Sequence, residues 1–182
     1  MELYKILTEV IDLRSFSNLW YWIMLAVIWS CSSHWVLGIP FDMIMRAKRE
    51  GGVALADLGQ VAEINSRRFL QISRTAAVPM FFFLSFFFTG LAVLSFYYWV
   101  EFAQALFLLT IWFLPVGWLT LRLALVIEAE RGGSQEQGPL CDTRLCNGLL
   151  WLRRKVQVIG MFAILVTAMF GMWRNLSHSI LY

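Results

Sequence analysis

Charged residues are scarce in this chain, and one long stretch has almost none. Asp, Glu, Lys and Arg make up 15% of the 182 residues, against about 25% in an average soluble domain. Between Thr75 and Leu121, Glu101 is the only such side chain. The hydrophobic share is 59% and the mean hydropathy is +0.66. This composition indicates an integral membrane protein, and the small, dispersed net charge of +3 argues against binding to nucleic acid.

Cysteine is scarce as well, because the chain has three. Cys31 lies in an apolar stretch, whereas Cys141 and Cys146 form a C-x4-C pair in a polar loop. Three cysteines do not form a disulfide framework. Iron–sulfur clusters usually take four thiolates, which this chain supplies only if two protomers each contribute the loop pair. We interpret all three as ordinary thiols and expect no metal and no cofactor. Cys141 and Cys146 are the candidate residues for the alternative, a metal or cluster site.

Catalytic signatures are absent too. The sequence has no Gly-rich phosphate loop, no zinc-protease helix motif and no triad-like arrangement, so we predict that the protein is not an enzyme. The start, "MELYKILTEVIDLRSF", has no basic region ahead of an apolar core and is not a signal peptide. Its apolar residues recur at helical spacing, which predicts a short amphipathic helix at the membrane interface.

Long apolar runs are abundant, and they predict four membrane spans at about 19–39, 79–100, 102–126 and 156–173. As one helix, Pro79 to Val126 would extend about 72 Å at about 1.5 Å per residue, more than twice a bilayer core of about 30 Å. This segment must therefore fold back, and adequate spans on both sides place the turn near residues 99–103. Pro115 should kink the third span by removing one backbone hydrogen bond.

The segments between the spans carry most of the positive charge. All of the 15 Lys and Arg except Lys5, Arg14 and Arg174 flank or lie within residues 41–78 and 128–155. The positive-inside rule places both segments in the cytoplasm and both termini outside. Gly51 and Gly52 should break the first segment ahead of a helix over residues 53–77. We predict one all-α domain over residues 1–182, a four-helix membrane bundle with an N-terminal interfacial helix and a helical cytoplasmic insertion.

Two lines of small residues recur at helical spacing, and such lines let membrane helices approach closely. One line is Ala163, Thr167 and Gly171, and the other is Ser85, Thr89 and Ala92. Both are predicted to be helix contact faces.

Three long pieces of the chain carry a resemblance to a known family. They are "IDLRSFSNLWYWIMLAVIWSCSSHWVLGIPFDMIMRA", "VEFAQALFLL" and "VIGMFAILVTAMFGMW". Together they resemble small bacterial inner-membrane proteins labelled as a component of the sulfur-mobilisation iron–sulfur cluster assembly complex. The likeness runs from about Asp12 to Trp173, apart from residues 131–148. It implies an inner-membrane location and association with that machinery, and it carries over no catalytic residue.

Few polar residues remain as functional candidates. Glu101 and Gln104 share one helical face beside the predicted outer turn, and Glu101 either points to water there or packs back between helices. His34, with Ser30 and Ser33, forms a polar stripe that favours helix packing over a quinone, haem or proton site. The basic residues Arg67, Arg68 and Arg74 are candidates for binding anionic lipid or a partner protein.

Three functional hypotheses follow from these candidates. The leading one is a non-catalytic membrane subunit that anchors or stabilises a larger assembly, which the resemblance links to iron–sulfur cluster assembly. The alternatives are a small oligomeric channel or transporter with Glu101 and Gln104 at its outer mouth, and an iron–sulfur or redox accessory using Cys141 and Cys146. The expected partners are the lipid bilayer and either another protein or further copies of this chain.

Overall fold

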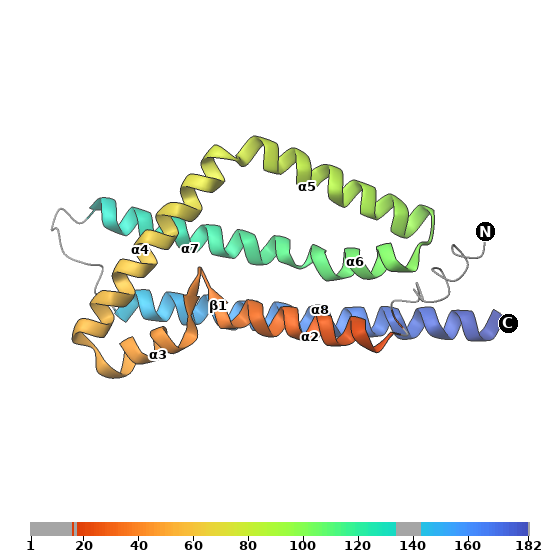
Figure 1. Cartoon of the computed structure of the whole chain (residues 1–182), viewed down its shortest axis with the longest axis horizontal. Coiled ribbons are helices and arrows are strands. Elements are labelled where there is room, and N and C mark those ends of the chain that lie inside the picture. The colour runs from red at the N-terminus through yellow and green to blue at the C-terminus, as the bar shows by residue number, and fades with distance from the viewer. Residues whose placement is uncertain (1–15, 17, 134–142, 182) are drawn as a thin grey trace, which may run out of the picture.

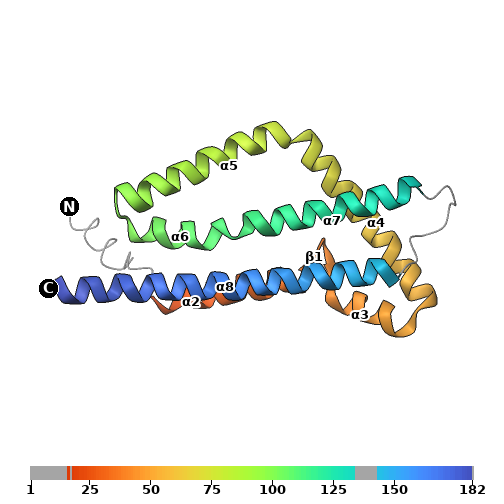
Figure 2. The same cartoon turned by 180° about the vertical axis from the view of Figure 1, so that it is seen from behind.

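The computed structural model describes residue 16 and residues 18–133 and 143–181, and nearly all of them are helical. The elements run α2 (Leu19–His34), β1 (Trp35–Val36), β2 (Ile39–Pro40), α3 (Phe41–Glu50), α4 (Gly52–Thr75), α5 (Ala77–Ala92), the π-helical turn η1 (Val93–Tyr97), α6 (Glu101–Ile111), α7 (Phe113–Gly133) and α8 (Thr143–Leu181). Figures 1 and 2 show α5 outermost, α6 and α7 nearly collinear beneath it, and α8 with α2 along the opposite side. The predicted interfacial helix at the N-terminus lies outside the described residues.

Within the described residues, three segments are long and apolar enough to cross a membrane. They are Ala77–Tyr97, Glu101–Glu130 and Arg144–Leu176. The protein is therefore a membrane protein, as its composition predicts. The last helix, α8, has 39 residues, or about 58 Å at about 1.5 Å per residue, so it extends well beyond the predicted span 156–173. The basic "LLWLRRK" stretch belongs to this same helix.

The first predicted span, 19–39, is a shorter helix followed by a tight hairpin. α2 has 16 residues, about 24 Å at about 1.5 Å per residue, which falls short of a bilayer core of about 30 Å. Trp35 pairs with Pro40 and Val36 with Ile39 across the hairpin. Leu37 and Gly38, at its tip, both have positive φ. Asn65 of α4 donates to the carbonyl oxygens of Leu37 and Gly38 at 3.3 Å each, which holds this turn.

The predicted fold-back is confirmed at residues 98–100, between η1 and α6. η1 is a widened turn closed by the Tyr98 N–H, which donates to the Val93 carbonyl oxygen at 3.2 Å, and the Val100 N–H beyond it donates to the Leu94 carbonyl oxygen at 3.1 Å. Trp99 has φ of 55°, a left-handed conformation that lets the chain reverse without glycine. The described turn therefore lacks the Gly, Pro or Asn that usually mark such reversals.

The third predicted span is broken near its middle, as Pro115 predicts. α6 ends at Ile111 and α7 begins at Phe113. Pro115 has no N–H to offer the carbonyl oxygen of Ile111, four residues earlier. This lost bond accounts for the break at that point.

α8 packs on α2 through residues that have little or no side chain. Ala163, Thr167 and Gly171 are buried, which confirms the predicted contact face. A methyl group built on Gly171 would lie 3.0 Å from the Phe16 ring, and one on Gly160 would lie 2.7 Å from the Trp29 indole. That indole stacks on Phe113 of α7 with ring centroids 5.2 Å apart. Gly160 therefore makes the space in which Trp29 joins three helices.

The segment predicted to be a helical insertion is helical and forms α3 and α4, which are separated at Gly51 and Gly52, both with positive φ. α4 slants across α8 and α7 before the chain enters α5 (Figure 1). Arg74 of α4 forms a two-pronged ion pair with Glu128 of α7, at 2.7 and 3.3 Å. We call the end of the molecule that holds α3, α4 and the start of α8 the basic end. We call the region around residues 98–101 the hairpin end.

Candidate functional site

Gln104 lies inside the hairpin end, with 1% of its surface exposed. Its Nε2 donates to the carbonyl oxygen of Ser95 at 2.8 Å. Ser95 is in η1, where the widened hydrogen-bonding pattern engages the carbonyl oxygens of Val93 and Leu94 instead. Gln104 therefore satisfies a buried backbone acceptor, and this bond ties the first turn of α6 to the end of the preceding helix.

Glu101 is the first residue of α6 and is partly buried. Its Oε1 accepts a hydrogen bond at 2.9 Å from the backbone N–H of Phe16. The carbonyl oxygen of Phe16 in turn accepts from the Trp22 indole at 3.1 Å. A carboxylate at a helix N-terminus is also favoured by the helix dipole. Glu101 thus connects the chain ahead of α2 to the hairpin end, and its carboxylate is engaged within the chain.

Two further residues from other helices contact this region. Arg174 of α8 donates to the carbonyl oxygen of Trp99 at 3.2 Å, and its guanidinium lies 5.4 Å from the Trp99 ring centroid. The Tyr21 hydroxyl of α2 donates to the carbonyl oxygen of Ala105 at 3.1 Å. Together with Glu101 and Gln104, these contacts bring α2, α8 and α6 together at the hairpin end.

The chemistry available at the hairpin end is structural. Gln104 satisfies the Ser95 carbonyl oxygen of the widened turn, and Glu101 satisfies the Phe16 N–H ahead of α2. The Ser95 hydroxyl and Gln104 Oε1 are buried with no hydrogen-bond partner among the described residues. The predicted pairing of Glu101 and Gln104 on one helical face is present, with each side chain directed to a different partner.

His34 and the cysteines do not form a site with these residues. His34 is exposed and its ring packs edge-on against Trp35 at 6.3 Å. Cys31 is exposed on α2, and Cys146 is buried near the start of α8. Cys141 lies outside the described residues. Over the described part of the chain, no group of His, Cys, Asp and Glu is suitably placed to hold a metal ion.

The three candidate arginines of α4 differ in their surroundings. Arg67 pairs with Glu63 one turn earlier, and Arg74 pairs with Glu128. Arg68 is exposed and borders a hollow at the end of α4. The sequence predicts the basic helix but does not separate these three roles, because the separation depends on which face of α4 packs against α7.

A largely uncovered face of α5 is the second notable feature. It consists of Phe82, Ser85, Phe86 and Thr89 of α5 with Val93 of the adjoining η1, all exposed, and we call it the α5 face. Phe86 has 81% of its surface exposed. A hollow of about 700 Å³ borders this face, lined by Thr89, Ala92, Val93 and the rings of α5, η1 and α6. In both views α5 diverges from α7 toward the basic end (Figures 1 and 2).

The predicted small-residue contact line Ser85, Thr89 and Ala92 therefore has no helix of this chain packed over it among the described residues: Ser85 and Thr89 are exposed and Ala92 is half-buried. The matching line on α8 is buried against α2 and Phe16. Of the two predicted contact lines, the one on α8 is therefore buried and the one on α5 is largely exposed.

Sequence reasoning missed Tyr21, Ser95 and Arg174 as members of the hairpin end. Arg174 carried a usable signal, since it is one of the few basic residues expected on the same side as Glu101. Ser95 carried no signal in the sequence, because its carbonyl oxygen is left for Gln104 only by the widened turn. Comparisons with known protein families, with curated proteins and with solved structures found no match for this chain.

Proposed function

We propose that the chain is a non-catalytic membrane subunit whose α5 face binds a membrane-embedded helix of a different protein in a larger assembly. The observation that carries this proposal is the exposure of the α5 face beside a hollow of about 700 Å³. α5 packs on α6 and on the elements at its own ends. The rest of the helix surface is left for lipid or for another protein.

The composition of the α5 face favours a protein helix. Lipid tails are as apolar as leucine, so helices associate in membranes through close packing rather than through the hydrophobic effect. Small residues allow the backbones to approach, and the α5 face supplies Ser85 between Phe82 and Phe86 and Thr89 just beyond Phe86. The same device operates within this chain, where Gly160 and Gly171 of α8 admit Trp29 and Phe16.

The membrane placement belongs to the same proposal. In it, α2 and its hairpin form a fourth crossing beside α8, which the exposed apolar side chains Leu19, Met24 and Val27 support. The basic end lies in the cytoplasm and both termini lie outside, in accord with the positive-inside rule. The bacterial inner membrane and the link to iron–sulfur cluster assembly stay predictions from the resemblance.

Co-purification tests the proposed function. The tagged full chain is purified in mild detergent, and the accompanying membrane proteins are identified and quantified. Gly90→Trp places a bulky ring beside the α5 face, whereas Gly117→Trp places the same ring on α7. A side chain begun at either glycine meets nothing within 4 Å, so both variants should fold. We expect one protein in stoichiometric amount with the wild type and Gly117→Trp, and at least tenfold less with Gly90→Trp.

Two results would contradict this expectation. One is a monodisperse homo-oligomer of the wild type with no second protein. The other is equal recovery of the accompanying protein with both variants, which would place the contact away from α5.

A further inference from the structure

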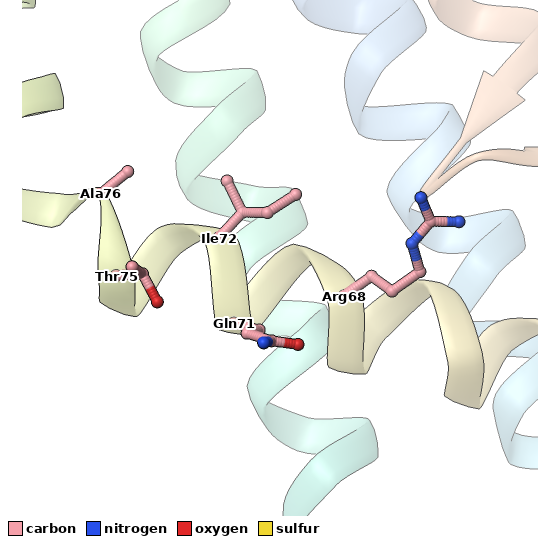
Figure 3. Close-up of a pocket in the computed structure, with 5 residues that line it drawn as sticks. All are labelled: Arg68, Gln71, Ile72, Thr75 and Ala76. Atoms are coloured by element: carbon pink, nitrogen blue, oxygen red, sulfur yellow. The ribbon is translucent and has the colours of Figure 1, made fainter.

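A hollow of about 410 Å³ lies where α4 bends into α5, lined by Arg68, Gln71, Ile72, Thr75 and Ala76. These positions follow the spacing of one helical face, and Figure 3 shows them in succession from Arg68 to the bend. The buried residues Ala62, Ser66 and Leu70 occupy a different face of α4. The hollow therefore opens on the outer side of the helix, away from the core.

Arg68 is the one of the three α4 arginines whose charge is not neutralised by an ion pair within the described residues. Arg67 pairs with Glu63 and Arg74 with Glu128. On α3, Arg46 forms an ion pair with Glu50, and this hydrogen bond raises the pKa of Arg46. Lys48 and Arg49 of α3 are exposed but do not line the hollow. The hollow thus combines a free guanidinium with the Gln71 carboxamide and the Thr75 hydroxyl.

The position of the hollow suggests what fills it. The membrane-length segment of α5 begins at Ala77, directly after the last lining residue, Ala76. Ile72 is 61% exposed and Val78, in the first turn of α5, is 67% exposed. Polar lining groups therefore give way to bare apolar surface just where the chain enters the membrane.

We propose that this hollow binds the phosphate headgroup of an anionic phospholipid, with Arg68 as the cation and the acyl chains lying along the first turn of α5. A guanidinium matches a phosphate in charge and in hydrogen-bonding geometry. Figure 3 shows Arg68 and Ile72 on one side of the α4 ribbon and Gln71 and Thr75 on the other, so the headgroup contact rests on Arg68 with the apolar Ile72 beside it. A free phosphate ion would use Arg68 but would gain nothing from Ile72 and Val78, so the apolar part of the surface favours the lipid. This site is independent of the α5 face and of the partner proposed above.

Lipid binding to the purified full chain tests this assignment. The probe is dioleoylphosphatidylglycerol, titrated in neutral detergent and counted as bound lipid by native mass spectrometry, with dioleoylphosphatidylcholine as the zwitterionic comparison. We expect the wild type to prefer phosphatidylglycerol. Arg68→Gln should weaken that binding by about fivefold, the typical contribution of one basic residue near an anionic surface. Arg67→Gln is the matched control, since it removes the same charge one residue away, and should change binding by less than about twofold.

Each other outcome overturns the assignment. Equal losses in Arg67→Gln and Arg68→Gln would show diffuse surface charge in place of a site. Displacement of the lipid by millimolar inorganic phosphate would identify a free anion as the ligand. No preference for phosphatidylglycerol over phosphatidylcholine would leave an acidic protein segment as the occupant. Unchanged binding in Arg68→Gln, with the variant eluting as the wild type does, would remove Arg68 from the site.

Discussion

Gly160→Val should destabilise the protein by about 1–3 kcal/mol, the usual cost of inserting methyl groups into a close-packed core. The first added carbon would lie 2.7 Å from the Trp29 indole. That indole is held against Phe113 on its other side, with nearly parallel rings, so it cannot shift away without breaking the stack. The measurement is the thermal unfolding midpoint of the purified protein in detergent, which should fall by several degrees.

Gly117→Val is the matched control for this substitution. Gly117 is exposed on α7, and a side chain begun there meets nothing within 4 Å. Removing a helical glycine avoids its entropic cost of roughly 0.5–1 kcal/mol, so the midpoint should stay level or rise slightly. Equal midpoints for Gly160→Val and Gly117→Val would show that α2 does not pack on α8 through Trp29.

Gln104→Leu should destabilise the hairpin end by about 1–3 kcal/mol, because it leaves the buried Ser95 carbonyl oxygen without a partner. Leucine fills nearly the same volume as glutamine, so the loss reports the hydrogen bond rather than a cavity. The bond is 2.8 Å long and is shielded from water, since Gln104 is 1% exposed. The thermal midpoint should fall, and cleavage by added protease near residues 98–100 should become faster.

Thr110→Val serves as the comparison for Gln104→Leu. The Thr110 hydroxyl bonds to the Leu106 carbonyl oxygen at 2.7 Å within α6, one turn back on the same helix. Such local bonds contribute little to helix stability, since the same carbonyl oxygen already serves the helix, and the midpoint should change by well under a degree. A midpoint for Gln104→Leu equal to that of the wild type would mean that the Ser95 carbonyl finds another partner.

The membrane-length segments were predictable because hydropathy over about 20 residues is a strong, local signal. The turn before Glu101 followed from length alone, since Pro79 to Val126 is too long to cross once. The break at Pro115 followed from a missing N–H. Each of these inferences depends on one segment and needs no knowledge of its neighbours.

The first predicted span does not stay helical to its end, and the reason is physical. "WVLGIP" is apolar enough to continue a membrane helix, yet the structure turns it into a hairpin held by Asn65, which lies 27 residues beyond Gly38. The buried strand residues Val36 and Ile39 complete the core at the basic end. A tertiary contact outweighed the local pattern, and hydropathy carries no record of that contact.

The hydrogen-bond partners of Glu101 and Gln104 likewise depend on tertiary packing. Spacing placed Glu101 and Gln104 on one face of a helix, but it did not show that Glu101 would accept from the Phe16 N–H or that Gln104 would reach Ser95. The two small-residue lines look alike in sequence. Only the packing shows that the Gly171 line is covered and that the Ser85 line is left open.

The most direct test of the α5 face as a docking surface is photo-crosslinking in intact membranes. A photoreactive phenylalanine analogue replaces Phe86 of α5 in one variant and Met161 of α8 in another, two side chains that are 81% and 72% exposed. We expect an adduct with one other membrane protein from position 86, the same protein that accompanies the purified chain, and no such adduct from position 161. An adduct of twice the mass of the chain as the sole product at position 86, or identical products from both positions, would contradict it.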